Sequence, residues 1–325
     1  MTDVVTVFGA SGFIGTYVVR ALCARGMRVR AAVRRPHIAN DLRVLGTPGQ
    51  VQLVQANVRN RPSVARAVEG ADAVINLVGV LFESGRQKFR AVQTQGARNV
   101  AEAAKAAGID RLVHVSAIGA DPDANSDYAR TKGLGEAAVR EAFPAASIIR
   151  PSIVFGPEDE FFNKFANMFR YTPAFVPIPI LMHGGKTRFQ PVYVRDVAEA
   201  IARVIERPET AGKTFELGGP QIYTFKELLK YTLEEIDRPR FLLPAPGIVG
   251  YLIALAGELV GATPFWDPPI TRDQVRLLKH DNIVNAEGGV LTLADLGIAP
   301  DTVEAIAPSY LERYRRYGQF HESAA

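Results

Sequence analysis

The sequence predicts an α/β protein built on a parallel β-sheet with helices on both faces. Three observations predict it: short β-branched runs alternate with longer helical patterns, glycines close several of these patterns, and the chain can bury a large core. The chain has 325 residues, of which 47% are hydrophobic, and a mean hydropathy of +0.03. These values exclude a disordered protein and favour one large domain with a smaller one.

The first half of the chain contains the strand and helix patterns in regular alternation. Helices are expected at residues 13–25, 61–69, 88–107 and 129–143, and Gly26, Gly70 and Gly108 follow three of them, where helix ends favour glycine. Such alternation gives a doubly wound parallel sheet. The six expected strands are residues 4–8, 28–33, 51–55, 73–78, 111–116 and 146–149.

The character of the sequence changes after Pro151, where prolines and aromatic residues become frequent. We expect the sheet domain to cover residues 1–157, and a strand at 189–194 and a helix at 197–205 to return to it within 188–207. Residues 158–187 and 208–325 then form a smaller C-terminal α/β lobe beside the carboxyl ends of the strands. Open parallel sheets bind their ligands at that edge.

A glycine-rich segment follows the first strand directly and precedes a helical pattern. Glycine permits a tight turn and lets backbone N–H groups approach a pyrophosphate, and the helix N-terminus supplies unpaired donors. The segment therefore predicts a Rossmann-type dinucleotide site, with the spacing G-x-x-G-x-x-G in place of G-x-G-x-x-G. The residues expected to bind the cofactor here are Gly9, Ser11, Gly12, Phe13, Ile14 and Gly15.

Two arginines, Arg34 and Arg35, follow the second strand, about 20 residues beyond the glycine loop. A site for NAD has an acidic residue there, which binds the ribose hydroxyls. Guanidinium groups instead bind a phosphate through paired hydrogen bonds, so the sequence predicts NADP(H) as the cofactor. The alternative is that both arginines are ordinary solvated side chains.

Residues at the ends of the third and fourth strands complete the expected cofactor edge. Asn57 and Val58 follow the third strand and are placed to reach the adenine, and Leu77, Val78 and Gly79 at the end of the fourth are placed near a ribose. Neither the pair after the third strand nor the triplet at the end of the fourth would by itself predict a cofactor site. Together they follow the same edge of the sheet as the glycine loop.

A tyrosine and a lysine stand one helical turn apart in the sequence YARTK. Tyr128 and Lys132 share one helical face, and a nearby ammonium group favours the phenolate, so we expect a lowered pKa for Tyr128. Such a pair can donate a proton to a carbonyl as a hydride arrives. An isolated pair of this spacing is more often a surface contact.

The ordered motifs GASGFIG, NLVG, HVS, YARTK and IIRPSIVFGP resemble those of the extended and atypical short-chain dehydrogenase/reductases. The resemblance covers nearly the whole chain and implies catalytic roles for Ser116, Tyr128 and Lys132, with Pro151 and Ile153 beside the nicotinamide. It also marks two departures. Ala117 stands where active relatives carry a second hydroxyl, and Gln93 where many carry asparagine in a proton relay.

The later motifs PEDEFFNKFANM, QPVYVRDVA, PFWDPPITRDQV and LADLGI are similar to the NADPH-binding accessory subunits of respiratory complex I. That likeness implies a structural cofactor and, as partners, the peripheral arm of complex I and the membrane surface. The alternative is an active NADPH-dependent reductase that acts on a small apolar carbonyl or quinone-like substrate.

Charge and composition limit the other classes of function. The net charge of +4 is too mild to predict nucleic-acid binding, the five histidines show no metal-ligand spacing, and Cys23 is the single cysteine. We find no signal peptide or spanning segment, and we expect a cytoplasmic protein, or one peripheral on the cytoplasmic face of the inner membrane.

Two segments of the smaller lobe have open interpretations. The apolar run 247–260 is expected to be either a buried helix or an interfacial helix that acts with Phe265 and Trp266. The basic residues after it are expected to form either a solvated helix face or a contact with anionic headgroups. They are Arg272, Arg276 and Lys279. The tail 310–317, rich in tyrosine and arginine, is a docking segment or an ordinary terminal helix.

Overall fold

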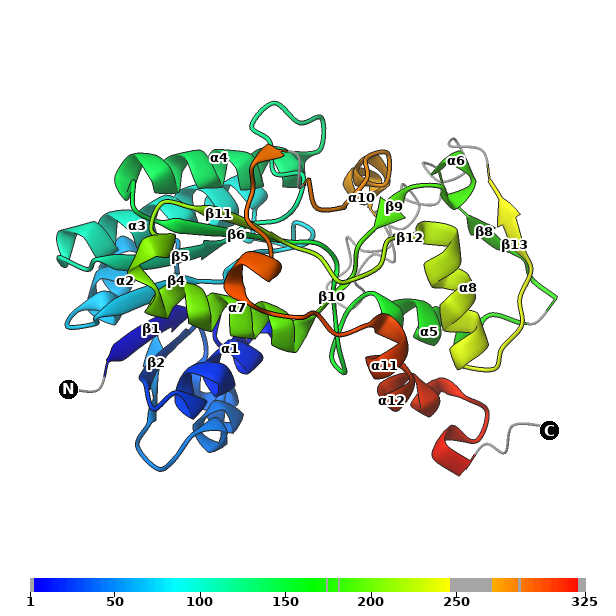
Figure 1. Cartoon of the computed structure of the whole chain (residues 1–325), viewed down its shortest axis with the longest axis horizontal. Coiled ribbons are helices and arrows are strands. Elements are labelled where there is room, and N and C mark those ends of the chain that lie inside the picture. Colours follow the sequence, from blue (N-terminus) through cyan, green and yellow to red (C-terminus); the bar gives the residue numbers. More distant parts are fainter. Residues whose placement is uncertain (1–2, 174, 181, 246–270, 286–287, 321–325) are drawn as a thin grey trace. The chain divides into compact units, whose positions relative to one another are not determined.

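The structure is a computed structural model that describes residues 3–173, 175–180, 182–245, 271–285 and 288–320 (Figure 1). The apolar run expected to be helical at 247–260 and the aromatic residues 265 and 266 lie outside the described residues. The chain divides into two compact units. The first comprises Met1–Pro151, Val194–Leu217 and Val284–Ala299, and the second Ser152–Tyr193, Gly218–Ile283 and Pro300–Ala325.

A seven-stranded sheet forms the centre of the first unit. Its order is β11-β6-β5-β4-β1-β2-β3, and all neighbouring strands are parallel, which confirms the doubly wound α/β fold. The strands are β1 (Val4–Phe8), β2 (Arg28–Val33), β3 (Val51–Gln55), β4 (Ala73–Asn76), β5 (Arg111–Val115), β6 (Ser147–Pro151) and β11 (Thr214–Leu217).

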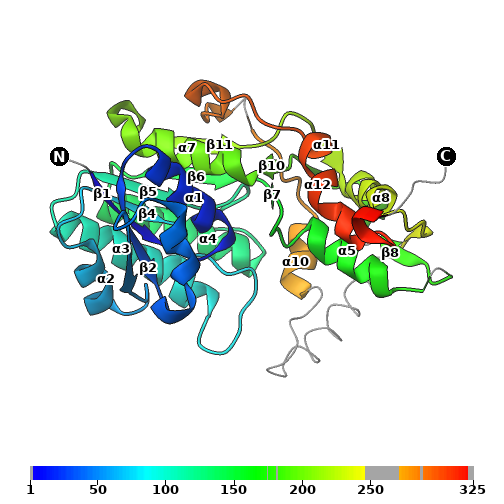
Figure 2. The same cartoon turned by 90° about the horizontal axis from the view of Figure 1, so that it is seen from below.

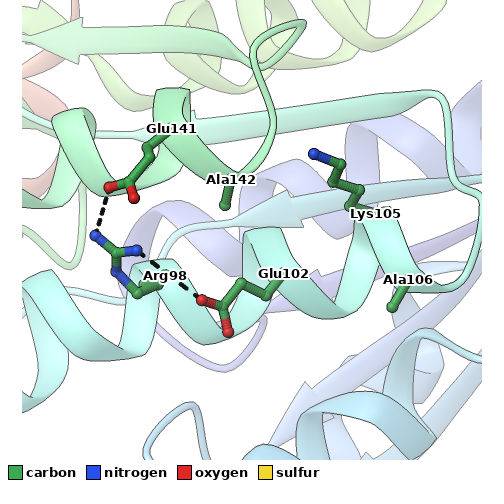
Figure 3. Close-up of a pocket in the computed structure, with 6 residues that line it drawn as sticks. All are labelled: Arg98, Glu102, Lys105, Ala106, Glu141 and Ala142. Carbon is green, nitrogen blue, oxygen red and sulfur yellow. Dashed lines mark hydrogen bonds and ion pairs between the residues drawn. The ribbon is translucent and has the colours of Figure 1, made fainter.

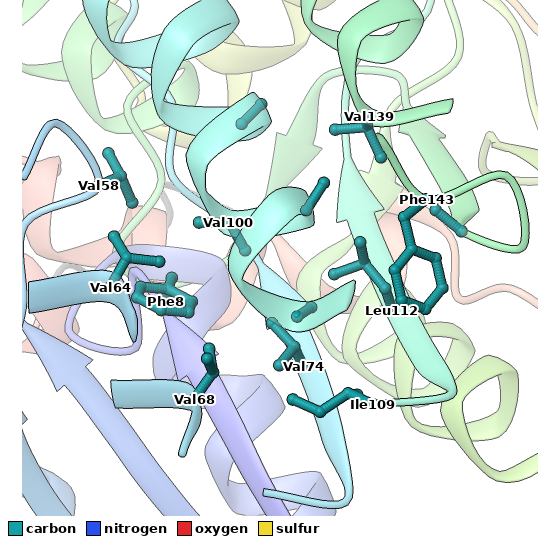
Figure 4. Packing of buried hydrophobic residues seen from close by; sticks show 14 of the residues in the cluster. Phe8, Val58, Val64, Val68, Val74, Val100, Ile109, Leu112, Val139 and Phe143 are labelled. Carbon is teal, nitrogen blue, oxygen red and sulfur yellow. The ribbon is translucent and has the colours of Figure 1, made fainter. Parts of the chain in front are cut away.

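Helices cover both faces of this sheet. Alternate side chains of each strand point to opposite faces, so apolar residues on both faces are buried by helices. Phe8, Val74 and Leu112 lie in one apolar core with the helices α2 (Arg61–Val68), α3 (Gln95–Ala106) and α4 (Asp127–Ala142) (Figure 4). The helices α1 (Phe13–Ala24) and α7 (Val194–Glu206) pack against each other on the other face. A π-helical turn, Arg90–Thr94, precedes α3.

Gly26, Gly70 and Gly108 have φ angles of +78°, +66° and +70° after α1, α2 and α3. The left-handed conformation expected at these three helix ends is therefore present. Among the described residues of the unit, 3-10 turns are formed by Pro36–Ile38, Asn40–Leu45, Pro208–Thr210 and Ala294–Leu296.

The prediction that residues 189–194 extend the main sheet is wrong. Pro191 has no N–H to donate, and the segment is divided into β9 (Arg188–Phe189) and β10 (Val192–Tyr193). These pair within the second unit with β12 (Tyr223–Thr224) and β7 (Val154–Phe155). The edge position beside β6 belongs instead to β11. The helix expected at 197–205 is α7, which lies in the first unit.

The second unit is held by an aromatic core. Phe161 packs edge-on against Phe162, Phe165 and Phe225, with ring centroids 5.1–6.2 Å apart. Its remaining elements are α5 (Phe162–Tyr171), β8 (Ile178–Ile180), α6 (Met182–Gly185), α8 (Phe225–Glu235), β13 (Leu242–Pro244), α10 (Arg272–Leu277), α11 (Val303–Ile306), α12 (Pro308–Leu311) and the 3-10 turns Glu312–Tyr314 and Gly318–Phe320. In the described part of the chain, no helix combines the length and apolar content needed to cross a bilayer.

Candidate dinucleotide site

The glycine loop joins β1 to α1 in a turn closed by its own backbone. Gly9 has a φ of +82°, and the Gly12 N–H donates to the Gly9 oxygen at 3.0 Å. Gly12 is the N-cap of α1 and offers no side chain to the first-turn N–H groups, which have no acceptor inside a helix. These donors and the helix dipole suit a phosphate. Ser11 and Gly12 are exposed, and Phe13 and Ile14 are half-buried.

Glycine is sterically required at the third position of the loop. A Cβ on Gly15 would lie 2.2 Å from the Gly9 oxygen and 2.7 Å from the Ala10 oxygen, so any side chain would push the helix from the loop. A Cβ on Gly9 would meet the end of β4, at 3.3 Å from the Leu77 carbonyl carbon and from the Val78 nitrogen. The loop thus fits a group that needs close backbone approach, as a pyrophosphate does.

The two arginines lie at the carboxyl end of β2, beside this loop. The Gly9 N–H donates to the Ala32 oxygen at 3.3 Å, and β2 ends at Val33. Arg34 and Arg35 come next and are both exposed, and the Arg34 guanidinium donates to the Gln87 side-chain oxygen at 2.5 Å.

Asn57 and Val58 are engaged in internal contacts. The Asn57 Oδ1 accepts from the Arg59 backbone N–H at 3.1 Å, and Val58 is part of the apolar core. The Val58 oxygen accepts from the Asn99 amide at 2.8 Å. Their expected role near the adenine stays a prediction.

A buried amide–imidazole pair links β4 to β5 below the Leu77–Gly79 segment. Asn76 and the His114 Nδ1 lie 3.1 Å apart, and the Asn76 Oδ1 accepts from the Val78 N–H at 3.2 Å. The pair therefore fixes the backbone that follows β4. Burial, with a smaller effect of the Lys132 charge, lowers the pKa of His114 to about 3, so the ring is neutral. The sequence did not predict this side-chain partner.

Lys132 points from α4 to the end of β5. Its Nζ donates to the Val115 oxygen at 3.2 Å, and a Cβ on Gly79 would lie only 3.2 Å from that Nζ. Burial lowers the pKa of Lys132 to about 8, against an opposing effect of Glu136. Because Gly79 has no side chain, the ammonium group of Lys132 has room at this edge of the sheet.

Tyr128 lies in the first turn of the same helix and packs edge-on against Phe89, with ring centroids 6.0 Å apart. Burial raises the pKa of Tyr128 to about 12, opposite to the direction expected from Lys132. The expectation is wrong because burial removes water from the phenol and so disfavours its charged form. At neutral pH Tyr128 is therefore a protonated donor.

Ser116 directly follows the last residue of β5, and its N–H donates to the Ile149 oxygen at 2.7 Å. It is 3% exposed, and within the described structure its Oγ has no hydrogen-bond partner, as is also true of the His114 Nε2. Buried polar atoms without partners are rare in folded proteins, and a bound ligand or water is a usual explanation. The residue after it is Ala117, which adds no hydroxyl.

Gln93 connects α4 to the loop that follows β4. It is buried in the π-helical turn, donates to the Val80 oxygen at 2.7 Å and accepts from the Thr131 hydroxyl at 2.7 Å. Thr131 stands between Tyr128 and Lys132 on α4. Gln93 thus holds the helix that carries the predicted catalytic pair, a role that the sequence did not indicate.

A buried charge network supports α4 from behind. The Arg150 guanidinium donates to both oxygens of Glu136, at 2.9 and 2.7 Å, and lies 3.4 Å from Glu216 on β11. Glu216 also accepts from the Asn285 N–H at 2.9 Å. Glu136 stands one turn after Lys132, and its charge opposes the lowering of the Lys132 pKa by burial.

The matches to known proteins agree with this geometry. Residues 5–218 match the model of the NAD dependent epimerase/dehydratase family. The chain belongs to this family. It is 37% identical over 315 residues to the mitochondrial NADH dehydrogenase (ubiquinone) 1 alpha subcomplex subunit 9 of Mus musculus, covering 97% of this chain and 81% of that protein. The resemblance expected from the motifs is therefore confirmed.

Two further matches of this chain are informative. The ceramide reductase of Caulobacter vibrioides is 32% identical over 261 residues, which cover 80% of this chain and 78% of the reductase. The Escherichia coli NADPH-dependent quinone oxidoreductase QOR2, solved with NADPH, shares the fold, with a TM-score of 0.71 and 20% identity over 94% of this chain and 99% of that one.

The predicted site residues are divided between the two units. The glycine loop, the arginines, Leu77–Gly79, Ser116, Tyr128, Lys132 and Pro151 all belong to the first unit, and Ile153 belongs to the second. Pro151 ends β6, and its oxygen accepts from the Ile118 N–H at 3.1 Å. The roles of these residues in binding and catalysis stay predictions.

A shallow depression of about 370 Å³ on α3 and α4 is no candidate for this cofactor. It is lined by Arg98, Glu102, Lys105, Ala106, Glu141 and Ala142 (Figure 3). Arg98 binds Glu141 at 2.7 Å and lies 4.0 Å from Glu102, so its charges neutralise one another. Glu141 stands at the end of α4, whereas Tyr128 and Lys132 are near its start.

Proposed function

We propose that the chain binds NADP(H) in preference to NAD(H). The observation that supports this preference is the exposed pair Arg34 and Arg35 at the end of β2, with no acidic residue between Val33 and Asn40. The glycine loop, residues 9–15, would hold the pyrophosphate, the two arginines the 2′-phosphate, and Lys132 with Leu77–Gly79 a ribose. When bound, the reduced cofactor is a hydride donor.

The cofactor preference is tested by calorimetric titration of the purified chain with NADPH and with NADH. We expect tighter binding of NADPH by at least about tenfold, because charge-assisted hydrogen bonds to the extra phosphate are worth roughly 1.5–3 kcal/mol each. Equal affinities for the two cofactors would contradict the assignment of the arginines.

We further propose that the protein is an accessory or assembly component of respiratory complex I. The observation that carries this proposal is the similarity to a named complex I subunit over 97% of the chain. The cofactor then has a structural role: a ligand at a hundred times its dissociation constant stabilises the folded state by about 2.7 kcal/mol without any reaction. In a bacterium we would then expect the protein on the cytoplasmic face of the inner membrane.

Affinity purification from native membranes tests the association. The tagged chain should retain complex I subunits, and complex I purified through another subunit should retain the chain. If the cofactor is structural, the double substitution R34A/R35A should weaken both results when NADP(H) is limiting. Intact complex I without the chain, together with a tagged chain without complex I, would refute this function.

The second candidate is a working NADPH-dependent reductase on an apolar carbonyl or quinone-like substrate. It is favoured by the similarity to a ceramide reductase and by Tyr128 and Lys132, which stand one turn apart on α4. Tyr128, protonated at neutral pH, would supply the proton to the substrate oxygen. Lys132 would orient the ribose, and Ser116, directly after β5, would supply a hydroxyl to the substrate.

Turnover is tested by NADPH oxidation with a panel of apolar ketones, quinones and long-chain carbonyl lipids. An enzyme would show steady consumption that Y128F reduces at least about a hundredfold, since a positioned general acid contributes roughly 10²–10⁴-fold. The matched control is Y171F, at an exposed tyrosine of the second unit. No consumption with any substrate would leave the structural role as the function.

A further inference from the structure

A short turn between β4 and α3 closes on itself through two backbone hydrogen bonds. The Gln87 N–H donates to the Ser84 oxygen at 2.8 Å, and the Ser84 N–H donates to the Gln87 oxygen at 3.3 Å. Gly85, inside the turn, has a φ of +50°, in the left-handed region that favours glycine. We call residues 84–87 the 84–87 turn. Contacts with two other segments of the first unit hold it in place.

Two arginines from the ends of neighbouring strands bind this turn. The Arg34 guanidinium, directly after β2, donates to the Gln87 side-chain oxygen at 2.5 Å. Arg59, shortly after the end of β3, donates to the Arg86 backbone oxygen at 2.6 Å. β3 pairs with β2, β2 with β1 and β1 with β4, and parallel strands end at one edge of their sheet (Figure 2). The turn therefore lies at the edge that carries the glycine loop.

Both acceptors on the turn are electrically neutral. The Gln87 amide oxygen and the Arg86 carbonyl oxygen accept hydrogen bonds without cancelling the charge of the donor, as a carboxylate would. A guanidinium group has five N–H donors, and the contact with Gln87 uses one of those of Arg34. Arg34 is exposed, whereas Gln87 is half-buried. The contact thus orients the Arg34 guanidinium and leaves it charged, with further donors for an anion.

The acidic side chain next to the turn has other partners. The Glu83 carboxylate accepts from the Phe89 N–H at 2.8 Å and lies 3.2 Å from the Lys88 ammonium group. In the described part of the chain, the side-chain hydrogen bonds of Arg34 and Arg59 go to amide and carbonyl oxygens. The positive charge at this end of the site is therefore kept for a ligand.

We propose that Gln87 determines the preference of the site for a 2′-phosphate by holding Arg34 in a binding orientation without neutralising it. The inference rests on the proposed binding of NADP(H). A free arginine side chain loses rotamer freedom when a ligand orders it, and a side chain already oriented loses less. NAD(H) has no 2′-phosphate and gains nothing from this orientation. Gln87 is thus a positioning residue that acts through Arg34.

Calorimetric titration of the full chain with NADPH and with NADH tests this role. Q87E keeps the shape of the side chain but adds a carboxylate that would pair with Arg34. NADPH affinity should then fall at least about tenfold, because a charge-assisted hydrogen bond to the phosphate is lost. Q87M removes the acceptor without adding charge and should lower NADPH affinity about threefold, through the ordering of Arg34 on binding. NADH affinity should fall less than about twofold in both variants.

A matched control and a second background separate this role from a structural one. Q52E adds the same charge at an exposed glutamine near the amino end of β3 and should keep both affinities. In the R34A background, Q87M should not weaken NADPH binding further, because Gln87 acts through Arg34. A structural role of Gln87 would instead lower both affinities and the melting temperature in either background.

Three results would overturn the role of Gln87 while the wild-type preference for NADPH stands. In the first, Q87E keeps the wild-type ratio of NADPH affinity to NADH affinity. In the second, Q87M weakens NADPH binding equally with and without Arg34. In the third, Q87M tightens NADPH binding, since Gln87 would then compete with the phosphate for Arg34. A wild-type chain without any preference for NADPH would instead refute the proposed cofactor, and the role of Gln87 with it.

Discussion

The Lys132 ammonium donates to the Val115 backbone oxygen at 3.2 Å, so α4 and the end of β5 are joined by a buried cation. Lys132 is 5% exposed, and one carbonyl does not replace the water that an ammonium group loses on burial. Its pKa of about 8 reflects this loss. The ammonium group therefore lacks hydrogen-bond acceptors, and ribose hydroxyls and a tyrosine oxygen are acceptors of the kind it needs.

This depressed pKa predicts how stability changes with pH. Between about pH 8 and 10.5 the unfolded chain keeps the Lys132 proton while the folded chain has released it, so stability rises with pH through this window. The gain attributable to Lys132 is about 3 kcal/mol. K132M should abolish it, as measured by urea unfolding at pH 7 to 10, with K105M on the exposed face of α3 as control. Parallel pH profiles for wild type and K132M would show that Lys132 is not desolvated.

The geometry of the glycine loop predicts that alanine at Gly15 and alanine at Gly12 lower the dinucleotide affinity by different amounts. G15A places a Cβ 2.2 Å from the Gly9 oxygen, so the helix and the loop must separate, and dinucleotide affinity should fall at least about a hundredfold with a lower melting temperature. G12A places its Cβ 3.3 Å from the same oxygen, a contact that a small shift relieves. It should lose less than about tenfold in the same titration. A G15A protein that binds as the wild type does would remove the loop from the cofactor site.

The network behind α4 predicts a large loss of stability on removal of its cation. R150M leaves Glu136 and Glu216, each 5% exposed or less, without their guanidinium partner. Breaking a buried pair in this way costs about 3–5 kcal/mol, measurable by chemical denaturation at neutral pH. R98M, which breaks the exposed pair with Glu141, is the control and should unfold close to wild type. If R150M and R98M both lost only a little free energy of unfolding, Glu136 and Glu216 would be solvated.

The sequence predicted the strands and helices of the sheet domain best where apolar periodicity is strong. It failed at β11, a four-residue strand in which the charged Glu216 interrupts the pattern. Glu216 is tolerated inside the sheet only because Arg150 and the Asn285 N–H bind it, and these partners come from distant parts of the chain. The segment 189–194 before α7 was wrongly predicted to extend the main sheet. Its β-branched residues favour a strand, but Pro191 interrupts the strand because it has no N–H to donate.

At the candidate site, local sequence was sufficient for the parts that depend on backbone. The glycine loop and the Tyr128 and Lys132 spacing are visible in a few consecutive residues. The Asn76 pair with His114 and the Gln93 contact with Thr131 join residues 38 positions apart, so no local pattern reveals them. The pKa direction of Tyr128 depends on burial by the packed structure, which spacing alone does not give.

Arg34 and Arg35 predict the sharpest change in cofactor selectivity. Both are exposed at the carboxyl end of β2, beside the loop, so R34A/R35A should lower NADPH affinity about a hundredfold while NADH affinity changes less than about threefold. Arg28 begins the same strand at its opposite end and is also exposed, so R28A matches the substitution in type without touching the expected phosphate site. Calorimetry of the variants with each cofactor measures the selectivity ratio directly. If R34A/R35A weakened NADPH and NADH equally, the arginines would act on the whole dinucleotide through general electrostatics, and the preference for the 2′-phosphate would have to come from another residue.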